Sequence, residues 1–458
     1  MPAQSIDQLK SVFRGELIQP SDAAYESARK VYNGMIDKRP RLIAKCVDVA
    51  DVIAAVRYGT DNGMLTAIRG GGHNGAGLAT CDDGLVIDLS RMKGIRVNPA
   101  DKTVRVGAGC VWGDVDHATH AFGMATPCGF ISTTGVSGLT LGGGIGYLTR
   151  KYGLTIDNLL SVDMVLADGS FVTASAKDNA ELFWAVRGGG GNFGVVTSFE
   201  FRLQPVSTVQ FGPTFWPLEE SETILRAYRD FIKEAPEDIS GFFAFLVIPP
   251  APMFPEHLHL KKVCGIVWCC TASAEQTEKA LKPIVSLGHP LLHHVGPAPF
   301  PVVQSMFDGL FVPGLQWYWR ADNFTDLNDE AIARHAEHGA KLPTMLSTMH
   351  LYPVNGAAQR VGKKDTAYSF REALFAEVIV GVDPEPANAE KITKWCKDYW
   401  EALHPYSAGG AYLNFMMEEG QERIQAAYRD NYERLATIKK KYDPNNFFRV
   451  NQNIRPAK

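Results

Sequence analysis

The segment RGGGHN, residues 69–74, places three consecutive glycines between Arg69 and the pair His73 and Asn74. Consecutive glycines cost backbone entropy and bury no side chain, so they occur where the chain has to present bare backbone. Backbone N–H groups gathered in this way form concavities that bind phosphate and other anions. The segment therefore predicts an anion-binding loop, and His73 is the candidate functional side chain beside it.

Three more glycine-rich segments follow: VGAGCVWG (106–113), GVSGLTLGGGIG (135–146) and RGGGGNFG (187–194). None of them has the GxGxxG spacing between a first strand and a helix, which disfavours a Rossmann dinucleotide site. For any one of these loops, a tight turn in a β-rich domain is the favoured interpretation. Four loops together favour a long ligand with a pyrophosphate in its middle.

The composition sets outer limits on function. The chain has 458 residues, 45% of them hydrophobic, and a formal net charge of −4 with Lys and Arg dispersed. This length predicts two or three domains, and this charge gives no reason to expect nucleic acid as a partner. We also expect no membrane span, since no apolar run reaches about 18 residues, and no signal peptide.

Cysteines and histidines suggest neither disulfides nor metal. The eight cysteines are scattered and fit neither a disulfide framework nor a paired zinc site, so a reduced, cytoplasmic protein is expected. There is no HExxH motif, and carboxylates do not group around the closely spaced pairs His257/His259 and His335/His338. The sequence therefore predicts no metal site.

The elements that must position the glycine loops are short and mixed in type. Residues 48–63 have the apolar spacing and glycine stop of a helix, and LTAI (65–68) is a strand that leads directly into the first loop. Residues 162–173 predict a hairpin with a type I′ turn at Asp168-Gly169, and residues 196–203 predict a strand. The first part of the chain is therefore α+β.

The character of the sequence changes after Pro205. Residues 206–411 hold most of the tryptophans and prolines, with longer helical stretches and strands such as ALFAEVIVGV, and we predict a second domain there. The tail contains a patterned helix at 420–442 and ends in the asparagine-rich segment YDPNNFFRVNQNIRP. Such a segment is unusual for a frayed end, so we expect the tail to pack back onto the fold.

The segments RGGGHN, GVSGLTLGGGIGYLTRKYGLTIDNLLSVDMVLADG and LFWAVRGGGGNFGVVTSFEF together resemble the FAD domain of the vanillyl-alcohol-oxidase/p-cresol-methylhydroxylase (PCMH) superfamily. YDPNNFFRVNQNI resembles the C-terminal signature of its berberine-bridge-enzyme branch. The resemblance implies an α+β protein with a PCMH-type FAD domain of two subdomains, built from residues 1–205 and completed by residues 412–458. It also implies an inserted substrate domain at 206–411, whose antiparallel sheet is covered by helices.

In this family the histidine behind the glycines is bonded covalently to the 8α-methyl group of FAD, and here that position is His73. The alternative is a histidine that only hydrogen-bonds a flavin phosphate. Many relatives add a cysteine link to flavin C6, but the matching position is Ile131, and the nearest cysteine, Cys128, is three residues early. We therefore expect a single histidyl link, with Cys128 as a lining or packing thiol.

The resemblance also implies which other residues contact FAD. The later glycine loops are expected to pack against the pyrophosphate and the isoalloxazine, with the tail at the polar edge of the flavin. Each of these residues also has an ordinary use as a turn or cap. The predicted cofactor residues are Arg69, Gly70, Gly71, Gly72, His73, Asn74, Gly135, Val136, Ser137, Gly138, Gly142, Gly143, Gly144, Gly146, Gly194, Val196, Asn451 and Gln452.

The residue before Gly135 controls oxygen access to the flavin in this family, and here it is Thr134. A small β-branched residue leaves room for O2, which favours an oxidase over a strict dehydrogenase. Its hydroxyl also suits stabilisation of an oxygenated flavin, as in one subgroup of the family. The plain alternative is that Thr134 packs like valine.

Oxidation of a C–H bond beside O or N needs a base for the O–H or N–H proton. The family takes such residues from strands of the inserted domain and from the segment before the last helix. A lone histidine or tyrosine on a strand is more often a core residue. The candidates are His350 and Tyr352, which share a strand face, Tyr368, and Tyr412 with Asn414.

One departure from the family bears on the substrate. The plant members act with a tyrosine two residues after the flavin histidine, but here that position is Gly75, which disfavours a plant-like alkaloid or monolignol pocket. We expect an FAD-dependent oxidase that transfers hydride from a small alcohol, sugar, amine or secondary-metabolite substrate to histidyl-linked FAD, with O2 reduced to H2O2. The alternatives are an oxygenating enzyme, a dehydrogenase with another electron acceptor, and a flavin-storing protein. The expected assembly is a monomer or a homodimer.

Overall fold

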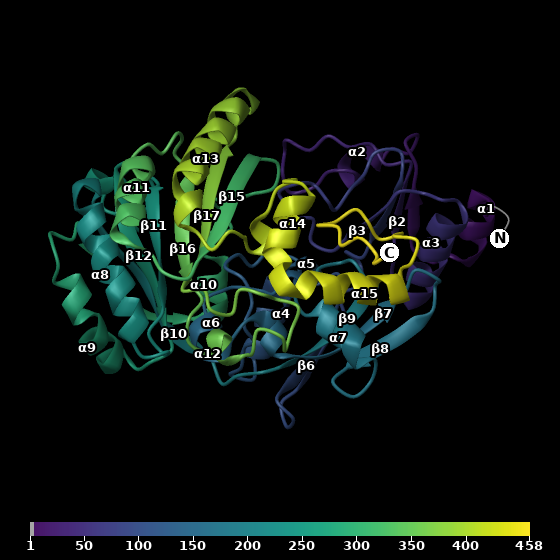
Figure 1. The fold of residues 1–458 in the computed structure, drawn as a ribbon, viewed down its shortest axis with the longest axis horizontal. Coiled ribbons are helices and arrows are strands. Elements are labelled where there is room, and N and C mark those ends of the chain that lie inside the picture. Colours follow the sequence, from purple (N-terminus) through teal and green to yellow (C-terminus); the bar gives the residue numbers. More distant parts are fainter. Residues whose placement is uncertain (1–3) are drawn as a thin grey trace.

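The structure is a computed structural model that describes residues 4–458. The described residues form three β-sheets with helices around them (Figure 1). The two smaller sheets lie in the right half of Figure 1, and the largest sheet with its helices lies in the left half. The short helices α1 (Ile6–Val12) and α2 (Tyr25–Ala28) belong to the right half.

The four-stranded sheet delivers the first glycine loop. Its order is β1 (Glu16–Ile18), β2 (Leu42–Lys45), β4 (Leu85–Asp88) and β3 (Thr66–Arg69). β2, β4 and β3 are parallel, whereas β1 is antiparallel to β2. Helix α3 (Val49–Asp61), capped by the Asp48 side chain, connects β2 to β3. The glycines of residues 70–72 therefore follow the carboxyl end of a parallel strand, an edge where ligands commonly bind.

The five-stranded sheet is antiparallel. Its order is β5 (Ile95–Asn98), β6 (Thr103–Gly107), β9 (Val195–Arg202), β7 (Leu159–Val165) and β8 (Phe171–Ser175). Its connections contain α4 (Trp112–His120), α5 (Val136–Gly142), α6 (Thr149–Tyr152) and α7 (Ala180–Val186).

β7 and β8 form the hairpin predicted at residues 162–173, but the predicted type I′ turn is wrong. That turn needs positive φ at both central residues, whereas Gly169, at 77°, has positive φ and Asp168 does not. The loop is longer and is closed by the Leu166 N–H, which donates to the Ser170 carbonyl at 2.9 Å.

The largest sheet has eight strands, all antiparallel, in the order β13-β10-β12-β11-β16-β17-β15, with β14 paired to β10. The strands are β10 (Thr208–Pro217), β11 (Gly241–Val247), β12 (Lys262–Cys270), β13 (Leu292–His293), β14 (Gly296–Pro299), β15 (Gln316–Phe324), β16 (Thr348–Pro353) and β17 (Phe375–Asp383). One face is covered by α8 (Ser221–Glu234), α9 (Ala274–Val285), α11 (Asp329–Gly339) and α13 (Ala389–Leu403). The opposite face shares a hydrophobic core with the smaller sheets. The short helices α10 (Phe300–Ser305) and α12 (Ala357–Arg360) lie between the halves.

The tail packs back onto the smaller sheets. The single helix predicted at 420–442 is wrong, because the chain breaks at Arg429, with φ of 48°, into α14 (Gln421–Tyr428) and α15 (Tyr432–Tyr442). α15 lies beside α7 (Figure 1). Lys439 and Asp443 form a fully buried ion pair at 2.6 Å, and Lys439 Nζ also donates to the Asn192 carbonyl at 2.6 Å. These contacts attach the tail to the fourth glycine loop.

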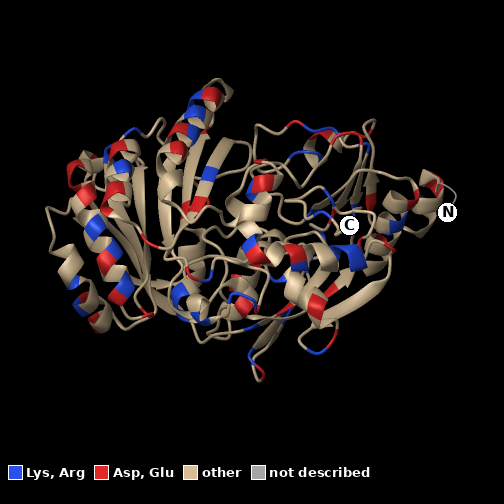
Figure 2. Ribbon diagram, viewed as in Figure 1, with Lys and Arg blue, Asp and Glu red and all other residues tan. Residues whose placement is uncertain are grey.

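The predicted α+β class is confirmed. The domain boundaries at residues 205 and 411 stay predictions, but the strands of the largest sheet all lie between residues 208 and 383. Acidic and basic residues are interspersed over the helices of both halves (Figure 2). Among residues 4–458, no helix combines the length and the apolar character needed to cross a membrane.

Candidate functional site

One cavity of about 650 Å³ extends between the smaller sheets and the open face of the largest sheet. Its lining combines residues from all three predicted segments of the chain, including every candidate catalytic residue except Tyr368. The predicted residues that it brings together are Gly70, Gly71, Gly72, His73, Asn74, Thr134, Gly135, Ser137, Gly138, Gly194, Val196, His350, Tyr352, Tyr412, Asn414, Asn451 and Gln452.

Arg69 lies outside the cavity lining, and its contact with a cofactor stays a prediction. Its buried guanidinium donates to the carbonyls of Ala28 and Ala79 and lies 3.6 Å from the Asp88 carboxylate. Burial of a guanidinium is tolerated because these acceptors satisfy its donors. Arg69 therefore fixes the end of β3, from which the glycine loop departs.

Val136 and the glycines around the end of α5 also lie outside the lining, and their cofactor contacts stay predictions. The Val136 N–H is used by the Cys110 carbonyl at 2.9 Å. A Cβ at Gly142 would overlap the Asn414 side chain, and Gly143 has φ of 131°. A Cβ at Gly144 or Gly146 would likewise overlap neighbouring protein atoms. Close packing and backbone conformation explain these glycines.

Other glycines leave backbone atoms accessible from the cavity, as binding of a ligand requires. Within residues 4–458, no protein acceptor pairs with the backbone N–H groups of residues 70–73. Gly138 and Gly191 line the cavity without positive φ, and no heavy atom lies within 4 Å of the place where a Cβ would be. In α5 such a glycine costs about 1 kcal/mol relative to alanine. A ligand lying against bare backbone accounts for this cost, which fits the predicted pyrophosphate.

The tail supplies a polar edge. Asn451 Nδ2 donates to the Gly191 carbonyl at 3.2 Å, while Asn451 Oδ1 is buried with no partner among the described residues. The Gln452 carbonyl accepts from Asn192 Nδ2 at 3.1 Å. A buried amide oxygen left unpaired costs about 1–3 kcal/mol, so this edge suits a ligand that brings an N–H group.

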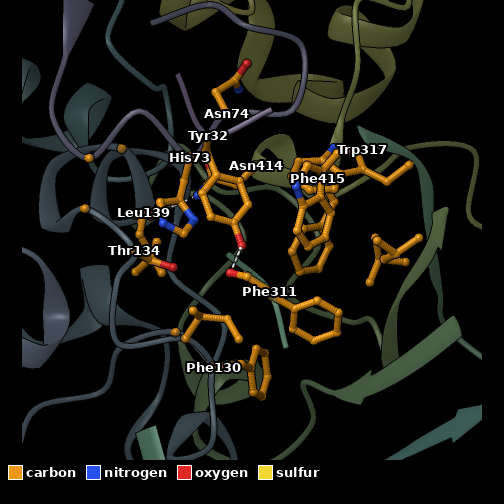
Figure 3. Close-up of a pocket in the computed structure, with 18 of the residues that line it drawn as sticks. Tyr32, His73, Asn74, Phe130, Thr134, Leu139, Phe311, Trp317, Asn414 and Phe415 are labelled. Atoms are coloured by element: carbon orange, nitrogen blue, oxygen red, sulfur yellow. Dashed lines mark hydrogen bonds between the residues drawn. The ribbon is translucent and has the colours of Figure 1, made fainter. Parts of the chain in front are cut away.

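His73 lies at the cavity wall beside Tyr32 (Figure 3). The two rings are stacked with centroids 3.9 Å apart, and the Tyr32 hydroxyl donates to the Phe311 carbonyl at 2.5 Å. His73 Nε2 is hydrogen-bonded to Thr133 Oγ1 at 3.1 Å, whereas Nδ1 has no partner within the described chain. Burial lowers the pKa of His73 to about 4, which a hydrogen bond with the Thr133 backbone only partly offsets. The imidazole is therefore neutral at physiological pH, and Nδ1 is its free nitrogen.

Near His73 the cavity wall contains Thr134 and Ile131 but not Cys128. Cys128 is fully buried, and its Sγ accepts from Gln304 Nε2 at 2.8 Å. Burial raises the pKa of the Cys128 thiol well above its usual value, so it is protonated and unreactive. The eight cysteines are all free and buried, and residues 4–458 contain no group of three or more His, Cys, Asp or Glu side chains that could hold a metal ion.

Tyr412 and Asn414 form one polar pair in the cavity. Tyr412 Oη accepts from the Gly144 N–H at 2.9 Å and from Asn414 Nδ2 at 2.7 Å. Asn414 Nδ2 also donates to the Leu139 carbonyl at 3.0 Å, which fixes its orientation. Burial raises the pKa of Tyr412 to about 12, and the donors to its oxygen oppose that rise. Such donors stabilise a phenolate, which makes Tyr412 a candidate base.

A second polar group lies on β16. Thr348 Oγ1 donates its only hydrogen to the Phe245 carbonyl at 2.8 Å, so it accepts from His350 Nε2 at 2.9 Å. His350 Nδ1 therefore carries no hydrogen and accepts from the Tyr352 hydroxyl at 2.6 Å. Burial lowers the pKa of His350 to about 3 and raises the pKa of Tyr352. The three side chains form one neutral hydrogen-bonded chain.

The aromatic wall of the cavity was not predicted. Trp319 lies against Gly75, where any side chain would overlap its indole, so the tryptophan fills the space beside the backbone at that position. Alternation along β15 is the only sequence signal that could have found Trp317 and Trp319, and none indicates Tyr32. The unpredicted aromatic residues include Tyr32, Phe130, Phe311, Trp317, Trp319 and Phe415, and Figure 3 labels all six of these except Trp319.

Comparison with known proteins gives consistent matches. The family model described as an FAD binding domain matches residues 40–175, and the model described as berberine and berberine like matches residues 411–455. An FAD-linked oxidoreductase of Dictyostelium discoideum is 30% identical over 99% of this chain and 97% of its own length. The (R)-6-hydroxynicotine oxidase of Paenarthrobacter nicotinovorans is 29% identical over 97% of each chain. The crystal structure of 6-hydroxy-D-nicotine oxidase from Arthrobacter nicotinovorans, 27% identical, superimposes with a TM-score of 0.87 over 99% of this chain and 100% of that chain.

Proposed function

The chain belongs to the berberine-bridge-enzyme-like branch of the PCMH-type FAD-linked oxidoreductases, and from this premise we propose that it is an oxidase with one covalent link, between His73 and FAD. It oxidises a small molecule at a carbon that bears a hydroxyl or amino group. FAD, when bound, accepts the hydride, and O2 takes up the electrons as H2O2. The relatives named oxidases support this direction of electron flow.

The environment of His73 carries the proposal. Thr133 engages Nε2 and leaves the neutral Nδ1 free at the cavity wall. A neutral ring nitrogen with a free lone pair is the nucleophile that a bond to the 8α carbon requires. The unpaired N–H groups of residues 70–72 lie directly before it in the chain and, with its own N–H, are suited to the pyrophosphate.

A single link is supported by the cysteines. Cys128, the candidate for a second link, does not line the cavity and is held by Gln304. At the position of the usual cysteine, Ile131 lines the cavity with a side chain that forms no such bond. His73 is therefore the one attachment that we assign.

Tyr412 is the base that we assign to the substrate proton. Its oxygen receives two N–H donors, so negative charge on it is stabilised when it deprotonates. The Tyr352 hydroxyl, in contrast, already donates to His350. Thr134 lines the cavity, and its hydroxyl makes no hydrogen bond to the described protein, which supports a site open to O2.

Acid precipitation tests the link. Wild-type protein loaded with FAD is expected to keep its yellow colour in the washed pellet, His73→Ala to lose it, and His117→Ala, an exposed histidine on α4, to keep it. Release of the flavin from wild type would contradict the covalent assignment. A yellow His73→Ala pellet would move the attachment to another residue, with Cys128 tested next.

Peroxide measurement tests the electron acceptor. Hydrogen peroxide equal to the substrate consumed supports an oxidase. Flavin reduction with little oxygen uptake indicates a dehydrogenase, and oxygen from O2 in the product indicates an oxygenating enzyme; either result overturns the oxidase assignment.

A further inference from the structure

The proposed oxidase activity does not define the substrate. The lining of the cavity restricts the chemical classes of substrate that fit. Resting on that function, we infer that the substrate is an uncharged, mainly aromatic molecule that donates a hydrogen bond to Tyr352, and that it is not a sugar, a carboxylate or an ammonium ion.

The face of the largest sheet towards the cavity is apolar on nearly every strand. Alternate residues of β10, β11, β15 and β17 supply Phe211, Phe215, Phe242, Trp317, Val378 and Val380. Polar side chains of this face are concentrated on β16. A ligand on this surface buries apolar area against almost the whole sheet, and aromatic pairs add to that stabilisation.

The cavity lining, among residues 4–458, also has no charged side chain that could form an ion pair with a charged ligand. No Asp, Glu, Lys or Arg side chain of these residues lines the cavity. A carboxylate or ammonium would lose its hydration without gaining an ion pair, which is strongly unfavourable. The aromatic rings attract a cation, but that attraction is smaller than the cost of desolvating an unpaired ammonium.

The hydrogen bonds already made on β16 determine which polar group a ligand needs in order to bind there. Thr348 uses its hydrogen on Phe245, His350 uses its hydrogen on Thr348, and Tyr352 uses its hydrogen on His350. Both nitrogens of His350 are then occupied. The group left for a ligand is a lone pair on the Tyr352 oxygen, which only accepts. The ligand therefore donates there, through an O–H or N–H.

Two further hydroxyls around this part of the cavity are already engaged. Tyr32 donates to the Phe311 carbonyl, and Ser347 Oγ accepts from the Val382 N–H at 3.1 Å. The indole N–H groups of Trp317 and Trp319 are buried without a partner among the described residues, so two donors remain for a ligand. A sugar carries more hydroxyls than these groups and Tyr352 can satisfy, and each hydroxyl left unpaired against the aromatic rings has a cost. An oligosaccharide is therefore disfavoured.

The entrance of the cavity is also apolar. Met253 and Met345 both line the cavity, yet 62% and 44% of their respective surfaces are exposed to solvent. Flexible, polarisable methionines at an entrance suit apolar ligands of varied shape.

The test uses benzyl alcohols and larger aryl homologues that differ only in one ring substituent: hydroxyl, methoxy, carboxylate or ammoniomethyl, a strongly hydrated primary ammonium. Cellobiose is the sugar probe. Binding is followed by quenching of tryptophan fluorescence, and flavin reduction by anaerobic bleaching. We expect the hydroxyl compound to bind about tenfold more tightly than its methyl ether, the value of one hydrogen bond. Both charged compounds are expected to bind at least about a hundredfold more weakly than the hydroxyl compound, and cellobiose is expected neither to bind nor to reduce the flavin.

Tyr352→Phe is the discriminating variant. It is expected to remove the tenfold preference for hydroxyl over methoxy while leaving methoxy binding unchanged, because only the acceptor is lost. Tyr147→Phe is the matched control: Tyr147 contacts the Phe130 ring as Tyr352 does, but its hydroxyl is buried without a partner and outside the lining. It is expected to keep the preference.

The outcomes separate the two proposals. Flavin reduction by cellobiose, tight binding of the carboxylate, or an equal loss of both ligands in Tyr352→Phe would overturn the substrate class and leave the oxidase intact. Selective binding of hydroxylated aryl compounds without flavin reduction would keep the ligand class and overturn the oxidase.

Discussion

At the scale of single residues, the cavity is governed by which atom each neighbour leaves free. Thr133 engages Nε2 of His73 and leaves Nδ1, whereas Thr348 and Tyr352 occupy both nitrogens of His350. Two neutral histidines in one cavity therefore have different capacities: one has a ring nitrogen without a protein partner, and the other holds a tyrosine in place. Tyr412 differs again, because its oxygen receives two donors.

The first prediction concerns Tyr412. Tyr412→Phe is expected to lower the rate of flavin reduction by a factor of about 10² to 10⁴, the usual contribution of a general base. In wild type the rate is expected to rise with pH, because the pKa of Tyr412, raised to about 12 in the free protein, lies above neutrality and deprotonation increases the active form. The variant is expected to lose this rise. Anaerobic stopped-flow measurement across pH checks both.

Tyr368→Phe serves as its control. The Tyr368 ring lies 6.3 Å from that of Tyr412, and its hydroxyl is buried without a partner and outside the cavity lining. A comparable rate loss in Tyr368→Phe, or an unchanged pH profile in Tyr412→Phe, would remove Tyr412 from the role of base.

At the scale of elements, α15 matters more than its position near the end of the chain suggests. Lys439 bridges three groups: the Asp443 carboxylate, the Asn192 carbonyl and the Phe448 carbonyl, at 2.6, 2.6 and 2.8 Å. Asp443 in turn accepts from two backbone N–H groups of the tail. One buried ion pair therefore orients both a glycine loop and the segment that carries Asn451.

Lys439→Met is expected to leave a buried carboxylate without its partner, which typically costs about 3–5 kcal/mol. We expect a large drop in thermal midpoint and weaker retention of FAD, measured by calorimetry on the apoprotein and on the loaded protein. Lys440→Met, on the exposed side of the same helix, is expected to be close to neutral. If both variants behaved alike, the ion pair would not be what holds the tail.

At the scale of the whole molecule, the two halves are joined by buried polar contacts. Arg150, on α6, donates to the carbonyls of Ile232, Ala235 and Pro236 at the end of α8, at 3.1, 2.9 and 3.2 Å. On the other side of the interface α4 packs against α10, where Asp116 and Gln304 are both buried. Burial raises the pKa of Asp116 from 3.8 to about 8, and the Gln304 amide opposes this only in part.

The raised pKa of Asp116 makes the stability of the folded protein depend on pH. The folded protein keeps a proton on Asp116 that the unfolded chain releases above about pH 4, so stability is full at low pH and declines as pH rises towards about 8, by up to about 1.4 kcal/mol per pH unit. Asp116→Asn, which mimics the neutral acid, is expected to flatten this decline and to be more stable than wild type at about pH 8. Thermal midpoints from about pH 5 to about pH 9 check it. Asp114→Asn on the same helix is expected to keep the wild-type slope, and an equal slope in all three proteins would refute the role of Asp116.

Local patterns predicted much of this molecule. Helix α3, the β7–β8 hairpin and the backbone loop before His73 follow from residue spacing, glycine runs and turn residues. Sequence could not separate glycines that face the cavity, such as Gly138, from glycines that pack against protein, such as Gly144, because both present the same bare backbone. The aromatic wall was also beyond local reasoning, since Tyr32 and Phe311 meet across 279 positions.

The contact between Asn192 and Gln452 spans 260 positions of the chain. At a translation rate of about 5–20 residues per second, the fourth glycine loop leaves the ribosome roughly 10 to 50 s before the residues that complete its wall. During that interval the nascent chain has the first glycine loop and His73 but no closed pocket around them. With the proposed link to His73, flavin attachment would follow synthesis of the tail, and tail docking would act as a checkpoint against loading FAD onto unfinished chains.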